Sequence, residues 1–212
     1  MIAIVDYGRG NLGSVEKAFA RLGVPATVTQ DPRAVDDAAA VVLPGDGAFH
    51  DAMANLQTLG LLAPLRRALD GTRPFLGICL GYQLLFTSSE EFGEGHGLDV
   101  IPGVVRRFPT GRKVPHMGWN SVEHGGRLRL FEGVPDGARF YFVHSYYPET
   151  RTADGATTGA GPLKHAWCDY GVRFAAAVEL GRVHATQFHP EKSQGWGLRL
   201  LENFAAIVKE SA

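Results

Sequence analysis

Short apolar runs alternate with segments of helical spacing through the first part of the chain. The runs predict buried strands at residues 2–5, 28–30, 40–43 and 75–79. Apolar residues at helical spacing predict helices over residues 16–22 and 48–69. Ser14 is expected to cap the first helix, and Pro64 to break the second or open a new turn. This alternation indicates a mostly parallel α/β sheet that is covered by helices on both faces.

The second half of the chain has a different pattern, in which glycines and prolines interrupt short β-rich runs. The expected strands lie at residues 104–108, 118–122, 138–147, 174–179 and 183–188, and an amphipathic helix is expected over residues 198–209. Because few helices separate these strands, the pattern favours an antiparallel extension of the first sheet or a second sheet packed on it. No repeat, low-complexity tract or linker divides the sequence, so one domain is expected over residues 1–212.

Composition and charge exclude several classes of protein. The formal net charge is −1 with 20% charged residues, so no bulk attraction to nucleic acid or to an anionic membrane is expected. The two cysteines, Cys79 and Cys168, are too few for a disulfide scaffold and suit a reducing compartment. The N-terminal segment lacks a basic region followed by a long apolar run, so no secretion signal is expected, and no run approaches the roughly 20 apolar residues of a membrane span. A cytoplasmic protein is therefore expected.

The segment PFLGICLGYQLLF places Cys79 at the end of an apolar strand, between Gly77 and Gly81. Small residues two positions before and after a nucleophile suit a sharp strand-to-helix turn, because a Cβ there would crowd the backbone. The helix is expected to begin at Gln83, and a helix N-terminus favours a thiolate. A cysteine on an apolar strand is usually a small core residue, but the flanking glycines favour a nucleophile.

The segment TQFHPE supplies a candidate base in His189 and a candidate orienting carboxylate in Glu191. The chain turns at Pro190, so the imidazole and the carboxylate can hydrogen-bond. Cys79 and His189 both follow expected strands, and functional groups collect at the carboxyl ends of parallel strands. The other histidines show no metal-ligand spacing, so neither a metal nor another cofactor is expected.

The segments GICLG, YQLLF and FHPE together resemble the class I glutamine amidotransferases over nearly the whole chain. The resemblance implies a class I amidotransferase fold with a flavodoxin-like core. It also implies a Cys-His-Glu triad that hydrolyses the side-chain amide of glutamine to glutamate and ammonia. In that triad Cys79 is the nucleophile, His189 the base and acid, and Glu191 the residue that orients His189.

Three further segments, VDYGRGNL, PHMGWN and FVHSYY, are similar to the glutaminase subunits of imidazole glycerol phosphate synthases. In that family the glutaminase binds a (β/α)₈ cyclase subunit as a heterodimer. Ammonia passes through the barrel to a ribulosyl aminoimidazole nucleotide, which gives imidazole glycerol phosphate and an aminoimidazole carboxamide ribotide in histidine biosynthesis. Two alternatives stay open: the glutaminase of another synthase, and a non-catalytic regulatory domain that keeps the fold.

The resemblance also implies how the substrate and the reaction intermediate are bound. The N–H of Leu80 is one expected donor to the oxyanion, and the loop containing Asp46 and Gly47 supplies the second once its peptide turns inward. Relatives usually have valine where this chain has Asp46; because a carboxylate beside an oxyanion costs energy, we expect Asp46 to contribute its main chain only. Gln83 is expected to bind the α-amino or the carboxylate group of glutamine. The remaining expected glutamine contacts are Gly47, Glu91, Ser145 and Tyr146.

A partner subunit would contact aromatic or amphipathic residues near the triad. The candidates are His116, Trp119, Asn120, Tyr141 and Lys192. Lys192 directly follows Glu191, so it is expected at the mouth of the site, where it can pair with Tyr141 by cation–π attraction. For each of them the alternative is a packed core aromatic or a solvated side chain.

Overall fold

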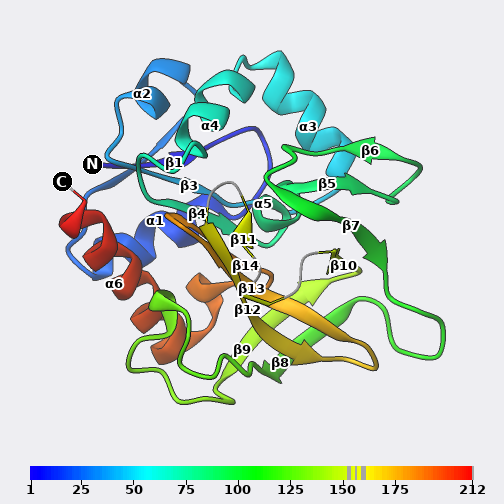
Figure 1. The fold of residues 1–212 in the computed structure, drawn as a ribbon. Coiled ribbons are helices and arrows are strands. Elements are labelled where there is room, and N and C mark those ends of the chain that lie inside the picture. Colours follow the sequence, from blue (N-terminus) through cyan, green and yellow to red (C-terminus); the bar gives the residue numbers. More distant parts are fainter. Residues whose placement is uncertain (152–153, 156, 159–160, 212) are drawn as a thin grey trace.

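The computed structural model describes residues 1–151, 154–155, 157–158 and 161–211, and its centre is an eight-stranded sheet (Figure 1). The strand order is β11-β12-β13-β14-β4-β3-β1-β2. The parallel part comprises β1 (Ile2–Val5), β2 (Ala26–Thr29), β3 (Ala40–Leu43), β4 (Phe75–Ile78) and β14 (Val183–Thr186). The antiparallel extension comprises β11 (Thr157–Thr158), β12 (Gly161–Asp169) and β13 (Arg173–Leu180).

Helices cover both faces of the parallel part, as the sequence pattern predicts (Figure 1). On one face lie α1 (Leu12–Arg21) and α6 (Gln194–Glu210); on the other lie α2 (Pro32–Asp36), α3 (Phe49–Thr58) and α4 (Leu62–Ala68). Side chains alternate between the faces along each strand. Ile4 packs in the cluster with α1 and α6, whereas its neighbour Val5 packs with α2, α3 and α4. Burial on both faces explains why these strands are continuously apolar.

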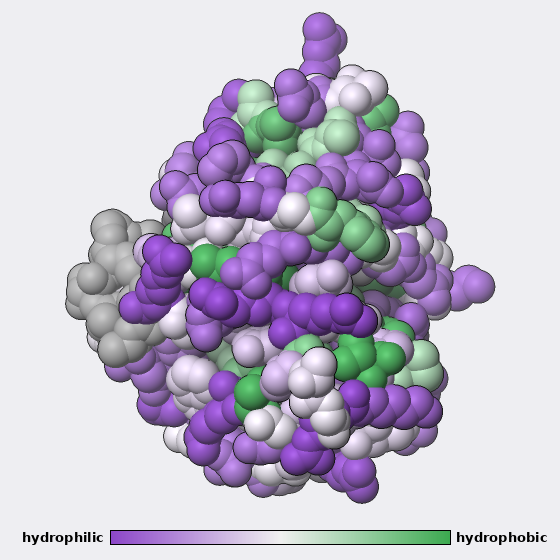
Figure 2. Space-filling model, turned by 90° about the vertical axis from the view of Figure 1, so that its right-hand side faces the viewer, coloured by the Kyte–Doolittle hydropathy of each residue, from purple (hydrophilic) through white to green (hydrophobic). Residues whose placement is uncertain are grey.

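Two smaller sheets complete the fold. One contains β5 (Phe86–Ser89), β6 (Gly95–His96), β7 (Ile101–Arg107) and β10 (Tyr146–Thr150) in the order β10-β7-β5-β6. The other pairs β8 (His116–Ser121) with β9 (Arg139–His144). Figure 2 shows one face of the molecule that is mostly hydrophilic, with apolar side chains in small separate patches. The second half of the chain thus contains both arrangements that the sequence left open: β11–β13 extend the main sheet, and β5–β10 form the two additional sheets.

Several predicted boundaries are wrong. Helix α1 begins at Leu12 after Asn11, so Ser14 lies inside its first turn and caps nothing. The break in the 48–69 segment falls at Gly60, whose φ of +68° follows the end of α3, whereas Pro64 lies in the first turn of α4, which confirms the second of the two roles expected of it. Helix α6 begins at Gln194, four residues before the predicted start, because Gly195 and Gly197 weaken the helical pattern there.

The elements next to the nucleophile also differ from prediction. The helix after Cys79 is a single turn, α5 (Leu80–Gln83), and the chain then enters strand β5 at Phe86. The 138–147 run is two strands, because Ser145 separates β9 from β10. The sequence pattern also missed α2 and β12. No helix in the described part of the chain has both the length and the apolar character to cross a membrane.

Candidate active site

Cys79 occupies a strained elbow between β4 and α5. Its φ of 55° and ψ of −104° are unusual for a residue with a side chain. A Cβ on Gly77 would lie 2.9 Å from the Gly81 carbonyl oxygen, and a Cβ on Gly81 would lie 1.8 Å from the Leu43 carbonyl oxygen. The expectation that side chains at these two positions would collide with the backbone is therefore confirmed.

The pairing of β4 with β14 brings the elbow and the FHPE segment together. The two strands are parallel neighbours, and the Cys79 N–H donates to the Thr186 carbonyl at 2.8 Å. His189 follows β14 and precedes a short 3₁₀ helix at Pro190–Lys192. Its N–H donates to the Tyr141 carbonyl at 3.0 Å, and its carbonyl accepts from the Ser193 hydroxyl at 2.6 Å. The base is thus held by β9 and by the start of α6.

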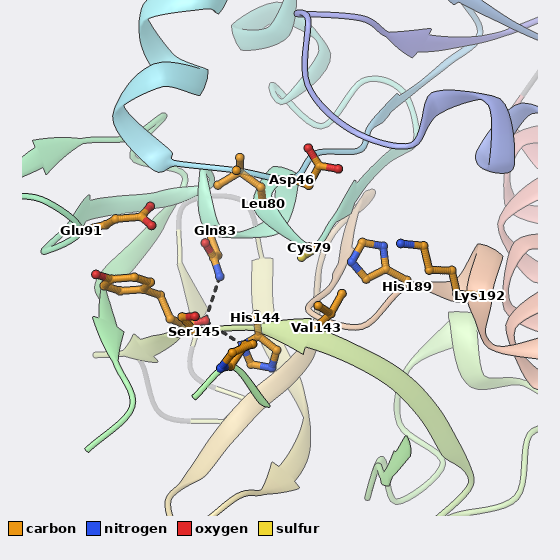
Figure 3. Close-up of a pocket in the computed structure, with 13 residues that line it drawn as sticks. Asp46, Cys79, Leu80, Gln83, Glu91, Val143, His144, Ser145, His189 and Lys192 are labelled. Atoms are coloured by element: carbon orange, nitrogen blue, oxygen red, sulfur yellow. Dashed lines mark hydrogen bonds between the residues drawn. The ribbon is translucent and has the colours of Figure 1, made fainter. Parts of the chain in front are cut away.

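Figure 3 shows the imidazole of His189 beside Cys79, and Glu191 is the hydrogen-bond partner of that imidazole. Its Nδ1 is 2.8 Å from Glu191 Oε1, and both side chains are buried, with 6% and 2% exposed. Burial alone would lower the pKa of His189, but the neighbouring Cys79 thiolate and the Glu191 carboxylate raise it to about 10. Because α5 has only one turn, its dipole is small, and the imidazolium supplies the positive charge beside the thiolate.

The loop after β3 points the carbonyl group of Gly45 at the elbow. The Leu80 N–H, an expected oxyanion donor, donates to the Gly45 carbonyl oxygen at 3.4 Å. The Asp46 carboxylate accepts from the Gly10 N–H at 3.0 Å, so its charge is directed at the loop between β1 and α1. Both Asp46 and Gly47 line the pocket. In this conformation the oxyanion donor is occupied by the protein's own carbonyl.

A cavity of about 420 Å³ lies above Cys79 and contains the other expected glutamine contacts. Gln83 and Glu91 lie on one side of Cys79, and His189 and Lys192 on the other (Figure 3). Glu91 is nearly buried, and its Oε2 accepts from the Phe49 N–H at the start of α3 at 2.7 Å. Ser145 and Tyr146 also line the cavity. All the sequence-predicted triad, oxyanion and substrate residues except Glu191 therefore line one cavity, and Glu191 is linked to it through its hydrogen bond to His189.

Gln187 is a pocket neighbour that sequence reasoning missed. It is fully buried, its Oε1 accepts from Gln83 Nε2 at 3.0 Å, and its Nε2 donates to Cys79 Sγ at 3.6 Å. The sequence signal that could have identified Gln187 is its polar side chain at the end of an apolar strand, directly before Phe-His-Pro-Glu, because a buried amide needs hydrogen-bond partners. His144, which also lines the cavity, was missed as well.

The interface candidates divide by exposure. Trp119 is 38% exposed and meets Tyr141 edge to face, with ring centroids 6.0 Å apart. Within the described residues no cation–π contact joins Lys192 to Tyr141. Asn120 is half-buried, whereas His116 is only 3% exposed and bonds to His144. His116 is thus an interior residue beneath the exposed part of β8.

Outside the pocket, the titratable side chains of the described residues form no metal site. The described residues contain no cluster of three or more histidine, cysteine or acidic side chains that could hold a metal ion. Cys168 is a buried free thiol, and burial raises its pKa to about 12. It therefore stays protonated and unreactive, as expected for a structural cysteine.

Comparison with known proteins agrees with this geometry. A family model described as glutamine amidotransferase class-I matches residues 3–208. The Desulfitobacterium hafniense protein named imidazole glycerol phosphate synthase subunit HisH is 51% identical over 212 residues, which cover 100% of this chain and 97% of that protein. A protein of the same name from Methanothermobacter thermautotrophicus is 49% identical, with 99% of this chain and 100% of that protein covered. A crystal structure of a glutamine amidotransferase shares the fold, with a TM-score of 0.72 at 22% identity, covering 99% of this chain and 100% of that one.

Proposed function

The chain belongs to the class I glutamine amidotransferase family, and we propose that it is the glutaminase subunit of an imidazole glycerol phosphate synthase. It hydrolyses the side-chain amide of glutamine and delivers the ammonia to a cyclase subunit in histidine biosynthesis, in the cytoplasm. The observation that carries the proposal is the Cys79 thiol on its elbow, beside a buried imidazole that Glu191 orients.

The triad geometry supports covalent catalysis in two steps. The Cys79 thiolate attacks the amide carbon, and the protonated His189 donates its proton to the departing ammonia. Water then attacks the thioester while His189 accepts its proton, and glutamate leaves. Glu191 keeps the Nδ1 proton of His189 in place, so that Nε2 faces the reacting atoms.

The pocket accommodates glutamine in one direction. Its side-chain amide lies at Cys79, and its amino-acid head lies toward Gln83 and Glu91, which offer acceptors for an ammonium group. Ser145 and Tyr146 line the same cavity, and we expect their main-chain groups to contact the substrate.

The loop at Gly45 must change conformation before the oxyanion can be bound. The tetrahedral intermediate needs the Leu80 N–H, which now donates to the Gly45 carbonyl. Turning the peptide between Gly45 and Asp46 removes that carbonyl and presents the Asp46 N–H instead. The bond from the Gly10 N–H to the Asp46 carboxylate holds the loop in its resting conformation. We infer that partner binding promotes this change.

The partner surface lies around the rim of the pocket. Trp119 and Met117 are 38% and 60% exposed on β8, and Lys192 lines the cavity directly. Aromatic and amphipathic side chains of this kind are common at the centres of interfaces. We assign Trp119, Asn120, Tyr141 and Lys192 to the contact with the (β/α)₈ cyclase, and give His116 an interior role.

The proposal is tested by mixing the purified chain with the cyclase subunit and its nucleotide and measuring glutamate release. Release should rise well above that of the chain alone, and Cys79→Ala should lower it by roughly a thousandfold or more. Lys192→Ala should weaken coupling to the cyclase while Cys79 alkylation stays unchanged. Release stimulated only by a different synthase would assign the chain to another pathway, and no release with any synthase would reject catalysis.

A further inference from the structure

Two buried histidines connect the surface of β8 to the glutamine pocket. His116 and His144 are cross-strand partners on β8 and β9, with His116 Nδ1 3.1 Å from His144 Nε2. Their side chains are 3% and 6% exposed. His116 also stacks on Tyr170 with a centroid distance of 3.9 Å. Neither ring hydrogen-bonds to Cys79, His189 or Glu191, so the triad leaves both histidines unexplained.

The hydrogen-bond partners determine which nitrogen carries each proton. His144 Nδ1 is 2.7 Å from the Tyr146 carbonyl oxygen, which can only accept, so Nδ1 carries the proton. In the neutral ring Nε2 is then an acceptor, and its neighbour His116 Nδ1 must be protonated. The acceptor left on His116, Nε2, lies 3.3 Å from the amide nitrogen of Asn120.

The orientation of Asn120 is itself fixed. Its Nδ2 donates to the Asp169 carbonyl at 2.9 Å, and its Oδ1 accepts from the Ser121 N–H at 2.8 Å. Rotating the amide would break both bonds. Every donor between Asn120 and the Tyr146 carbonyl therefore points the same way, toward the pocket.

The direction of these hydrogen bonds requires the rings of His116 and His144 to be neutral, and their burial keeps them so. Burial lowers the pKa of His116 to about 4 and that of His144 to about 3, and the Tyr146 carbonyl only partly opposes the effect for His144. The rings that surround the pair are aromatic: Phe108, Phe142, Phe174 and Tyr170. The neighbouring rings His116 and His189 each lower the pKa of His144 further.

The same carbonyl fixes the amide of Gln83. Gln83 Nε2 donates one hydrogen bond to the Tyr146 carbonyl at 2.9 Å and the other to Gln187 Oε1 at 3.0 Å. No described residue hydrogen-bonds the remaining atom, Oε1, and this side chain borders the cavity (Figure 3). Gln83 thus offers glutamine an acceptor and no donor. An acceptor suits the α-ammonium group and disfavours the α-carboxylate.

We propose that Asn120, His116 and His144 form a directional hydrogen-bond relay that holds the Tyr146 carbonyl in place, and that this carbonyl orients the Gln83 amide, so that the pocket selects substrates with an α-ammonium group. His116 and His144 are positioning residues, which act through Tyr146 and Gln83. The proposal rests on the glutaminase function and specifies how that site recognises the head of glutamine. The outer end of the relay lies on β8 beside Trp119, in the surface assigned to the cyclase.

The test compares glutamine with glutaramate, which lacks the α-amino group, as substrates of the complex with the cyclase. His116→Phe keeps the aromatic stacking but removes the proton given to His144. The preference in kcat/KM for glutamine over glutaramate should fall about three- to tenfold, through KM rather than kcat. His116→Asn, which restores a donor at the Nδ1 position, should retain most of the preference.

His124→Phe is the matched control, because His124 is also buried and stacked on a phenylalanine but borders no part of this pocket. It should leave the preference unchanged. An unchanged preference in a folded His116→Phe complex overturns the proposal. Nitrogen chemical shifts of the unmodified protein give a second test that needs no activity: both rings should show the neutral Nδ1–H form from pH 8 to 5. An Nε2–H form on either ring overturns the relay even if glutaminase activity is present, whereas failure of the glutaminase function appears as no glutamate release from the unmodified complex.

Discussion

Replacing Gly81 with alanine tests whether the elbow at Cys79 depends on the absence of a side chain. A Cβ at position 81 would lie 1.8 Å from the Leu43 carbonyl oxygen on β3 and 3.2 Å from the Leu43 side chain. Carbon atoms of this kind do not approach oxygen within 3.0 Å, so α5 and β3 must separate by about 1.2 Å. The φ of Gly81 is not positive, so the collision is purely one of space.

The size of the effect follows from what moves with α5. Forcing a methyl group into a packed interior costs about 1–3 kcal/mol of folding free energy. The shift also carries Cys79 and the Leu80 N–H away from His189, and a misplacement of about 1 Å can cost roughly a hundredfold in rate. Gly77→Ala should show a smaller effect, because its Cβ would stand 2.9 Å from the Gly81 carbonyl oxygen.

Urea unfolding and glutamate release with the cyclase measure the two effects separately. The matched control is Gly13→Ala on α1, where an added Cβ meets nothing within 4 Å. It should keep full activity and unfold at the same or a higher urea concentration, with up to about 1 kcal/mol gained in the helix. A Gly81→Ala protein with unchanged stability and turnover would refute the steric account of the elbow.

Three further predictions concern charge. Cys79→Ala should lower the pKa of His189 from about 10, because the thiolate no longer stabilises the imidazolium while burial still opposes it; an unchanged NMR titration would contradict the ion pair. Burial lowers the pKa of His144 to about 3 and of His184 to about 4, so stability should fall as the pH drops below 6.5, where the unfolded chain alone takes up these protons. Between pH 7 and 5 the free energy of unfolding should fall by about 2 kcal/mol for each of His144 and His184 and rise by about 1 kcal/mol because of His189. Urea midpoints that do not change with pH would be inconsistent with buried neutral rings. Asp46→Val should retain glutaminase activity in the assembled enzyme and raise partner-free hydrolysis about three- to tenfold, since it releases the resting loop; loss of activity in the assembled enzyme would show that the carboxylate itself is needed.

The parallel core was predictable because its strands are buried on both faces, and such strands are continuous apolar runs such as residues 2–5 and 40–43. Strand β12 was missed because its polar and apolar residues follow no clear alternation, and its pairing with β13 shifts register after Ala166. The helix after Cys79 begins at Leu80 rather than at the predicted Gln83, and it ends at Gln83 instead of continuing through Phe86. Tertiary pairing of β5 with β7 overrides the helical spacing of residues 83–86.

The sequence alone determined the chemistry that this protein carries. Cys79 needs glycines two residues away on either side, and His189 and Glu191 are near neighbours, so both arrangements are visible in short segments. Only the tertiary structure decided the state of those groups: the raised pKa of His189, the Gly45 carbonyl on the oxyanion donor, and the proton order through His116. The physical reason is that the elbow and the His189–Glu191 pair are each built from residue types a few positions apart, whereas the direction of a hydrogen bond and the charge on a buried ring depend on groups far away in the chain.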